Sequence, residues 1–181
     1  MKYKHGVAVA RCQPFHIAHA RLISKMLSEC EHVTIVLGSI QEHGTVKNPF
    51  SYADRKKMIT NVYRNTPDWD RLTVTGLADL NSEREWADYV LDHVGDIHSE
   101  REIAYPDAYY CGSHYDGHWF RNTKLKLEML DRTTQDFPYC SGTLVRDMCT
   151  YQDVRWKLYI HEVNWEIVKN LHDRLMWSRK Q

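Results

Sequence analysis

Short apolar runs alternate with segments of helical periodicity along most of the chain. Residues 7–10 and 33–37 are dominated by Val, Ala, Ile and Leu and end at polar or glycine residues, so we expect a buried strand at each. Between them, apolar side chains recur at spacings of one and three from residue 22 to residue 30. This spacing predicts a helix with one face against a core. The resulting order is strand, helix, strand.

The same order continues through the middle of the chain. Ser51 with Asp54 three residues later predicts a capping box at the start of a second helix. Its buried face is predicted to carry Met58, Ile59, Val62 and Tyr63. Strands are predicted at residues 72–75 and 108–112, with a helix from about Ser82 between them whose buried side carries Trp86, Val90, Leu91, Val94 and Ile97. This alternation favours an α/β fold, a Rossmann-like, doubly wound and mostly parallel sheet with helices on both faces.

The end of the chain is predicted to form one more helix, over residues 162–178. Its apolar side chains, Val163, Ile167, Leu171 and Leu175, are each four residues apart, as on one face of an amphipathic helix. We see no internal repeat, low-complexity stretch or linker. Residues 1–181 are therefore expected to form a single domain, which is long enough to bury a core without disulfides.

Composition narrows the classes of partner and compartment. The 24 Lys and Arg residues balance the 24 Asp and Glu residues, so no overall basic field favours nucleic acid, and we expect no such partner. Five cysteines, an odd number without a CxxC pair, argue against a disulfide framework and a zinc ribbon. No run has the length of a membrane span or of a signal-peptide core. We expect a cytoplasmic protein without a membrane partner.

The first candidate site runs from Arg11 to His19, after the first predicted strand and into a helix. Open parallel sheets bind ligands beyond the carboxyl ends of their strands. At a helix start, His16 and His19 can both offer an N–H to one phosphate, and Arg11 adds a permanent positive charge. Two ordinary surface histidines are the alternative. A zinc site is a third interpretation, although the usual helical zinc motif spaces its histidines by four around a Glu.

A second candidate is the segment from Tyr139 to Arg146. Ser141 or Thr143 can cap a helix there, and the free N–H groups at a helix start favour phosphate. Arg146, in the first turns, can add a charge-assisted contact to the same anion. Taken alone, this pattern also fits an ordinary capped helix with a surface arginine.

Two further polar segments could either bind a ligand or be ordinary solvated loops. The loop at residues 38–50 is long, as functional loops often are, and its Lys47 is either a phosphate contact or a solvated side chain. His114, Asp116 and His118 suggest a metal site, but a polar loop is favoured because further ligands are missing. We therefore expect no metal ligands in the protein.

Together, these segments resemble the HxGH nucleotidyltransferase superfamily. Its patterns R-x-Q-P-x-H-x-G-H and S-x-T-x-x-R are matched at residues 11–19 and 141–146. Within that superfamily, the loop at residues 38–50, followed by Arg55, is similar to the archaeal-type nicotinamide-nucleotide adenylyltransferases. The chain departs from the pattern at Ala18, where the family has glycine, and at Cys12, where it has a large hydrophobic residue.

The resemblance implies a role for each matched residue. His16, His19, Arg11 and Arg146 would be catalytic. Gln13, Ser141, Thr143 and Arg146 would contact ATP. Nicotinamide mononucleotide (NMN) would be bound by Lys47, Asn48, Asn81 and Trp86. From the residues alone, core packing is the favoured interpretation of Trp86; from the resemblance, it stacks on the nicotinamide ring.

The resemblance also implies a reaction. ATP and NMN would give NAD and pyrophosphate by in-line adenylyl transfer without a covalent intermediate, with Mg²⁺ held mainly through the ATP phosphates. A homo-oligomer is implied by analogy. The alternatives are a related adenylyl- or cytidylyltransferase acting on nicotinate mononucleotide or another phosphorylated acceptor, and a non-catalytic nucleotide-binding domain.

Overall fold

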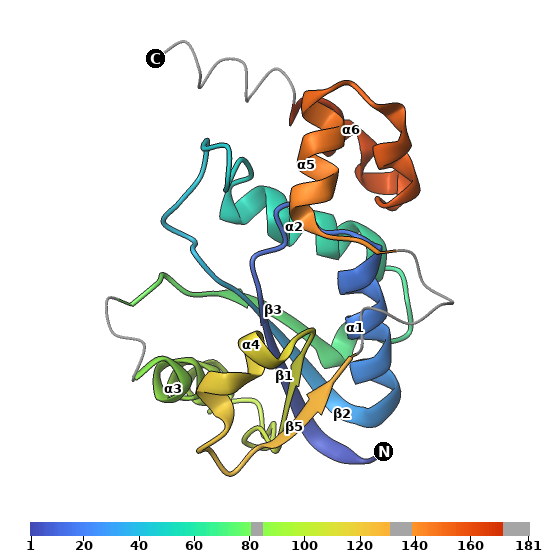
Figure 1. The fold of residues 1–181 in the computed structure, drawn as a ribbon. Helices are drawn as coiled ribbons and strands as arrows, with labels where there is room; N and C mark the ends of the chain where they lie inside the picture. Colours follow the sequence, from blue (N-terminus) through green and yellow to red (C-terminus); the bar gives the residue numbers. More distant parts are fainter. Residues whose placement is uncertain (81–84, 131–138, 172–181) are drawn as a thin grey trace.

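A five-stranded, fully parallel sheet forms the centre of the protein (Figure 1). The structure is a computed structural model, and it describes residues 1–80, 85–130 and 139–171. The strands are β1 (Tyr3–Ala10), β2 (Cys30–Leu37), β3 (Leu72–Gly76), β4 (Ala108–Cys111) and β5 (Lys126–Met129). Their order in the sheet is β3-β2-β1-β4-β5. The predicted Rossmann-like α/β fold is confirmed.

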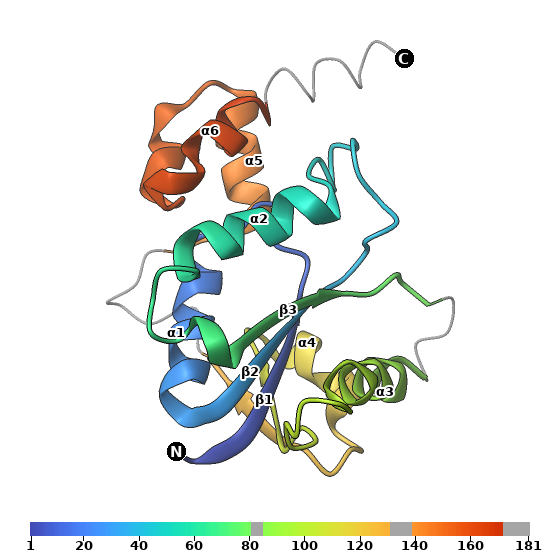
Figure 2. The ribbon, with the colours of Figure 1, turned by 180° about the vertical axis from the view of Figure 1, so that it is seen from behind.

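The strand order reverses next to β1, and this reversal positions the site. β1 pairs with β2 on one side and with β4 on the other, both in parallel. The helices that follow β1 and β2 lie on one face of the sheet, and the helix that follows β3 lies on the other face (Figure 2). In sheets of this kind, ligands bind at the carboxyl ends of the strands where the order reverses. Here that point lies just after Ala10.

Helices connect the strands, as the periodicity predicts. They are α1 (Ile17–Glu29), α2 (Tyr52–Tyr63), α3 (Trp86–His98), α4 (His114–Gly117), α5 (Gly142–Thr150) and α6 (Trp165–Lys169). Short 3₁₀ turns lie at η1 (Trp69–Arg71), η3 (His118–Phe120), η4 (Val154–Leu158) and η5 (Glu162–Asn164). The capping box at the start of α2 is confirmed, because the Ser51 hydroxyl accepts from the backbone N–H of Asp54 and the Asp54 carboxylate accepts from that of Ser51.

The two faces of the sheet have separate cores. Consecutive strand residues point to opposite faces, so Ala8 and Tyr110 pack with α1, α2 and α5, whereas Val7 and Tyr109 pack with α3. The first core is the larger and includes Ile23, Met26, Met58, Ile59 and Val145. The helices of the first core are therefore tied to the sheet independently of α3.

Three features differ from the sequence-based predictions. β5 was not predicted, because its Lys-Leu-Glu-Met sequence is half exposed at a sheet edge and has no apolar run. On α3, Ile97 is half-buried and His98 is buried beside it. Val163 was placed on a packed face but is 47% exposed, because the 3₁₀ turn η5 precedes α6 and shifts the helical phase. The predicted helix beyond Leu171 lies outside the described residues.

The cysteines behave as their number and spacing predict. All five are buried and free, without disulfides. Within the described ranges, no helix combines the length and the apolar character needed to cross a bilayer.

Candidate active site

The turn after β1 brings the first motif to the reversal point of the sheet. β1 ends at Ala10, and His16 is the N-cap residue of α1. Between them, Cys12 has a φ of 50°, which is uncommon for a residue with a side chain, and it is buried in the first core. Burial raises the pKa of the Cys12 thiol to about 12, so it is not a reactive thiolate at neutral pH. Cys12 therefore contributes to the packing of the first core.

His16 and His19 lie together at the start of α1. Their ring centroids are 3.8 Å apart and the rings are stacked at 24°. The backbone N–H of His16 donates to Nδ1 of His19 over 3.3 Å. Because Nδ1 accepts this hydrogen bond, the neutral ring of His19 carries its hydrogen on Nε2. His19 is thus oriented as an N–H donor beside the positive end of a helix dipole.

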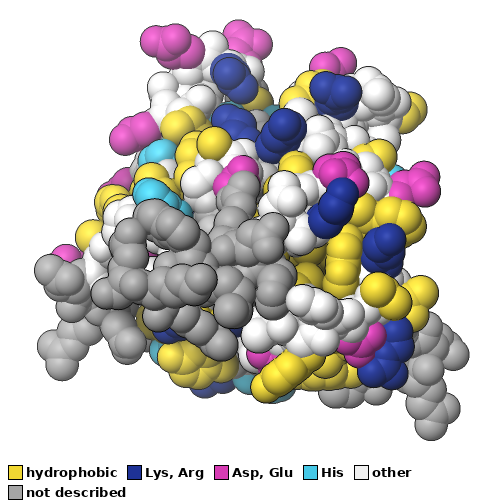
Figure 3. Space-filling view, turned by 90° about the horizontal axis from the view of Figure 1, so that it is seen from above, with side chains coloured by type: hydrophobic (Ala, Val, Ile, Leu, Met, Phe, Trp, Pro, Cys, Tyr) yellow, Lys and Arg dark blue, Asp and Glu magenta, His cyan; other side chains and the backbone are white. Residues whose placement is uncertain are grey.

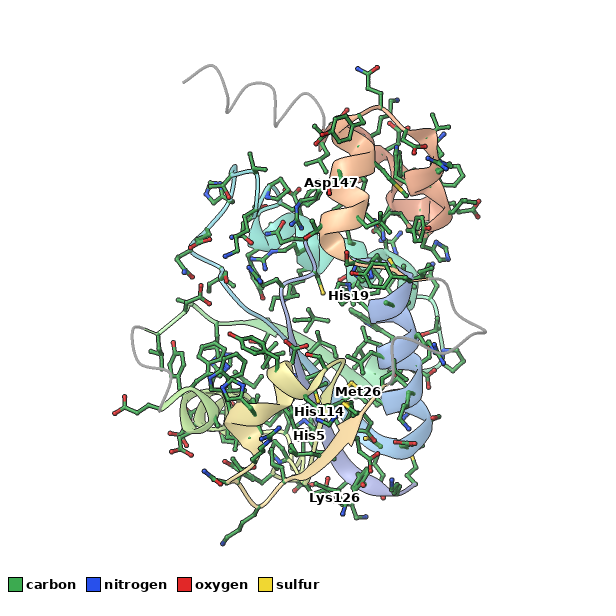
Figure 4. All side chains as sticks on the ribbon, viewed as in Figure 1. His5, His19, Met26, His114, Lys126 and Asp147 are labelled. Carbon is green, nitrogen blue, oxygen red and sulfur yellow. The ribbon has the colours of Figure 1, made fainter. Side chains whose placement is uncertain are left out.

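Arg146 links the second motif to the first. Its Nη1 donates to the carbonyl of Gln13 over 2.6 Å, and its Nη2 donates to the Thr143 hydroxyl over 3.1 Å. Gly142 makes this approach possible, since a Cβ there would lie 2.7 Å from the Gln13 carbonyl oxygen. The start of α5 therefore packs directly against the turn that carries the histidines. Figure 4 shows His19 at the end of α1 that faces α5, the helix that bears Asp147.

Ser141 caps α5, as one of the two predicted alternatives. Its hydroxyl accepts from the backbone N–H of Leu144 over 3.2 Å. Thr143 is exposed, and its hydroxyl accepts from Arg146 instead. The polar side chains of the second motif are thus used to fix the helix start and its arginine.

The site has a local excess of positive charge. Arg11 is exposed, and burial together with the nearby Arg11 charge lowers the pKa of Arg146. Two guanidinium groups close enough to repel each other are stabilised by an anion between or beside them. This excess is local, because Lys and Arg side chains are interspersed with Asp and Glu across the described part of the face in Figure 3. The geometry fits a phosphate group better than an extended polyanion.

Gln13 has a different setting from the other matched residues. It is 4% exposed, and its amide exchanges two hydrogen bonds with the backbone of Phe50, with lengths of 2.8 and 2.9 Å. The side chain of Gln13 therefore joins the first motif to the end of the long loop. The backbone carbonyl of Gln13, in contrast, accepts from Arg146 at the site.

Arg55 holds the same loops together from inside the protein. The side chain is fully buried and donates to four backbone carbonyls, those of Arg11, Gly38, Ser39 and Ser51. Sequence reasoning matched Arg55 to a family but missed this structural role. Nothing in local spacing reveals it, because its partners come from three separate segments.

The long loop at residues 38–50 is attached at several points. The Asp79 carboxylate, just beyond β3, accepts from the Ser39 hydroxyl and from the Gln41 amide, each over 3.0 Å. Lys47 is exposed, whereas Asn48 is 1% exposed and donates through its amide to Glu42. The structure thus separates two residues that the resemblance paired. Lys47 is free to reach a ligand, and Asn48 shapes the loop.

Comparison with known sequences establishes the family to which this chain belongs. The cytidylyltransferase-like family matches residues 7–168, most of the chain. The chain belongs to this family. The match includes both motifs, the second half of β1 and all of β2 to β5.

Curated relatives match about half of the chain. It is 33% identical over 100 residues to the nicotinamide/nicotinic acid mononucleotide adenylyltransferase of Acinetobacter baylyi, which covers 55% of this chain and 53% of that protein. It is 35% identical over 86 residues to the nicotinamide-nucleotide adenylyltransferase of Saccharolobus solfataricus, and this match covers 47% of this chain and 50% of that protein. The chain thus spans about half the length of the curated relatives it matches.

The fold of the cytidylyltransferase-like chain is also found in solved structures. It is similar to a bifunctional NMN adenylyltransferase/ADP ribose pyrophosphatase from Francisella tularensis, with a TM-score of 0.74 and 19% identity. The similarity covers 94% of this chain and 49% of that chain. At this identity, the likeness supports the fold.

The remaining predicted residues lie at the start of α3. Trp86 is the first residue of α3, half-buried against the second core, with its ring centroid 6.0 Å from that of Tyr89. Both interpretations of Trp86, core packing and an exposed stacking face, are compatible with a half-buried ring. Asn81 lies outside the described residues.

The segment after β4 is a capped turn. The Ser113 hydroxyl donates to the Asp116 carboxylate over 2.7 Å, and the ring of His118 lies 4.0 Å from that of Trp119. His114, Asp116 and His118 are not among the groups of described residues whose ligand atoms converge.

Proposed function

We propose that this cytidylyltransferase-like chain transfers the adenylyl group of ATP to NMN, giving NAD and pyrophosphate. The observation that carries the proposal is the convergence of His16, His19, Arg11 and Arg146 where α1 and α5 begin. These two helix starts, together with two arginines and two imidazoles, supply N–H donors and positive charge at one place. Phosphoryl and nucleotidyl transfer depend on such donors and positive charges to stabilise the transition state.

The chemistry follows from the substrates and these donors. A phosphate oxygen of NMN attacks the α-phosphorus of ATP, and the bond from that phosphorus to the bridging oxygen of the β-phosphate breaks. The attacking phosphate is already ionised at neutral pH, so no residue has to remove a proton. His19, oriented with Nε2–H outward from its Nδ1 hydrogen bond, and Arg146 stabilise charge on the departing pyrophosphate. We assign His16 to the same group and Arg11 to the space between the reacting phosphates.

The other residues carry supporting roles in this proposal. Ser141 and Thr143 hold the start of α5, so that its N–H groups and Arg146 face the ATP phosphates. The backbone carbonyl of Gln13 accepts from Arg146, and its side-chain amide holds the end of the loop at residues 38–50. Lys47, Asn48, Asn81 and Trp86 are proposed for the NMN side of the site.

Mg²⁺ fits this site as a companion of the substrate. Mg²⁺ prefers oxygen ligands, whereas the side chains proposed to contact the phosphates are imidazoles and guanidinium groups. The Asp79 carboxylate accepts from Ser39 and Gln41. ATP phosphates and water would therefore hold the ion. When bound, Mg²⁺ supplies charge neutralisation on the phosphates.

Nicotinate mononucleotide is the second acceptor to be tested, since the Acinetobacter baylyi relative is named for both mononucleotides. Purified protein is incubated with ATP, Mg²⁺ and either NMN or nicotinate mononucleotide, and the dinucleotide and pyrophosphate are measured. We expect equal amounts of NAD and pyrophosphate with NMN. Product only with nicotinate mononucleotide would change the acceptor, and ATP binding without product from either would favour a non-catalytic nucleotide-binding domain.

We also propose that residues 1–181 act as one catalytic domain in a cytoplasmic homo-oligomer, without nucleic acid or membrane partners. The exposed apolar side chains of the C-terminal segment, Tyr151, Val154 and Leu158, offer a surface for self-association. A light-scattering mass of a single chain would overturn the oligomer.

A further inference from the structure

Three histidines form a buried cluster at the amino-terminal end of the sheet, far from the proposed reaction. His5 lies near the start of β1, His32 pairs with it on β2, and His98 ends α3. Their ring centroids are 5.2, 5.1 and 4.9 Å apart, and one ring nitrogen of each lies within 4.8 Å of the others. Figure 4 labels His5 well away from His19. The cluster is thus separate from the candidate active site.

Hydrogen bonding fixes the orientation of the His5 ring. The carbonyl of Ala104 can only accept, so Nδ1 of His5 donates to it over 2.8 Å, and the lone pair of the neutral ring is on Nε2. Histidines that bind metals are commonly held in this way, with the second ring nitrogen donating to a carbonyl. His5 therefore presents Nε2 to the interior of the cluster.

A single hydroxyl lies between two of the rings. Thr34 Oγ1 is 2.8 Å from Nε2 of His5 and 2.9 Å from Nε2 of His98. Because the hydroxyl hydrogen is donated to His5, His98 must donate its own Nε2–H to Thr34, which leaves the His98 lone pair on Nδ1. His98 is only 3% exposed, and its Nδ1 has no hydrogen-bond partner in the described part of the chain. A buried lone pair without a donor is costly unless something else uses it.

A small cavity lies against one member of the cluster, His98. It has a volume of about 170 Å³, and His98, Ala104 and Glu102 are among its lining residues. A metal site needs an entry path and room for a fourth ligand. The cavity provides room beside His98, and Glu102 is among the residues that line it.

We propose that His5, His32 and His98 bind one transition-metal ion, with Zn²⁺ the best match. Three neutral imidazoles favour Zn²⁺ and related ions over Mg²⁺, which prefers oxygen. Zn–N bonds of about 2.0–2.1 Å set ligand nitrogens about 3.4 Å apart in a tetrahedral site. The rings therefore close together on binding, and the Thr34 hydroxyl leaves Nε2 of His5 but still accepts from Nε2–H of His98, whose Nδ1 binds the ion. Water or Glu102 supplies the fourth ligand. The ion would join β1, β2 and α3.

The first test measures Zn²⁺ binding to chelator-treated protein without nucleotides, by competition with a chromophoric chelator. We expect one ion per chain at the cluster and a higher unfolding temperature with Zn²⁺. His98→Gln is expected to weaken binding at least about a hundredfold, beyond the ten- to hundredfold typical of losing a second-shell partner. The matched control is His93→Gln on the same helix, whose ring bonds to Thr75 and lies outside the cluster. It should bind Zn²⁺ like the unmodified chain.

A second measurement does not depend on a variant folding. Long-range ¹H–¹⁵N spectra of the unmodified chain should show shifts of one ring nitrogen in each of His5, His32 and His98 when Zn²⁺ is added. Binding that is lost instead in His19→Ala would place the ion in the active site and overturn the proposal. Absence of tight Zn²⁺ binding by the unmodified chain would also overturn it, and neither result depends on whether the protein makes NAD.

Discussion

Histidines gather at both ends of the parallel sheet, but their surroundings differ. At the carboxyl end, His16 and His19 begin a helix beside two arginines, and His19 is half exposed. At the amino end, His5 and His98 are buried, and their partners are the single hydroxyl of Thr34 and the carbonyl of Ala104. The comparison shows that residue type alone does not define a phosphate site. Neighbouring cations and helix starts favour an anion, whereas burial lowers the pKa of the other histidines.

Replacing one histidine from each end should give the largest contrast. His19→Ala removes a donor aimed at the developing charge, so we expect turnover to fall by about 10²–10³-fold with little change in unfolding temperature. His32→Gln should instead lower the unfolding temperature and leave the turnover number of the folded protein unchanged. Steady-state kinetics and thermal unfolding of both variants check this pair. Near-normal turnover in His19→Ala would remove that residue from the site.

A second contrast separates two arginines at the carboxyl end. Arg146 reaches solvent, but Arg55 is fully buried among carbonyls. Arg55→Met leaves at least three of these acceptors without a donor, at about 1 kcal/mol each, so the free energy of unfolding should fall by about 3 kcal/mol. Urea unfolding measures this change. Arg64→Met, on the exposed end of α2, is the matched control and should change stability little.

The two ends also differ in how much their sequence reveals. Strands β1 to β4 and the starts of α1 and α5 follow from local periodicity and capping residues, because those signals lie within a few residues of one another. The edge strand β5 has no apolar run and escaped prediction. The histidine cluster unites residues 5, 32 and 98, whose proximity arises only when the sheet forms.

Within the candidate site, the same distinction applies residue by residue. The motifs identified His16, His19 and Arg146, which the structure brings together. The hydrogen bonds of Gln13 to Phe50 and of Arg55 to several carbonyls depend on segments more than fifteen residues away. Spacing therefore predicts which polar side chains gather at the helix starts better than which side chains hold the surrounding loops in place.

Acid should destabilise the metal-free protein mainly through the amino end. Burial lowers the pKa of His5, and it lowers the pKa values of His32 and His98 to about 4, whereas an unfolded histidine titrates near 6.5. Because the unfolded chain binds more protons between pH 6.5 and 4, stability is full above pH 6.5 and falls as the pH drops toward 4. We expect His32 and His98 each to contribute a loss of about 2 kcal/mol between pH 7 and pH 5.

Urea unfolding at both pH values, in the presence of a chelator, measures that loss. His98→Gln cannot take up a proton there, so the difference between the two pH values should shrink. His43→Gln changes an exposed histidine in the loop and should keep the full difference. An unchanged difference in folded His98→Gln would show that the cluster does not cause the acid sensitivity.

The smallest expected effect concerns Trp86, whose half-buried ring belongs to the carboxyl end but contributes to the second core. Stacking of a cationic pyridinium on an indole is worth about 1 kcal/mol at a partly exposed site, so Trp86→Ala should raise the KM for NMN roughly fivefold. Trp86→Phe retains an aromatic face and should lose less. The KM for ATP is the internal control, because ATP contacts are proposed on the helices α1 and α5. An equal rise in both KM values, with a lower unfolding temperature, would assign Trp86 to packing rather than to the mononucleotide.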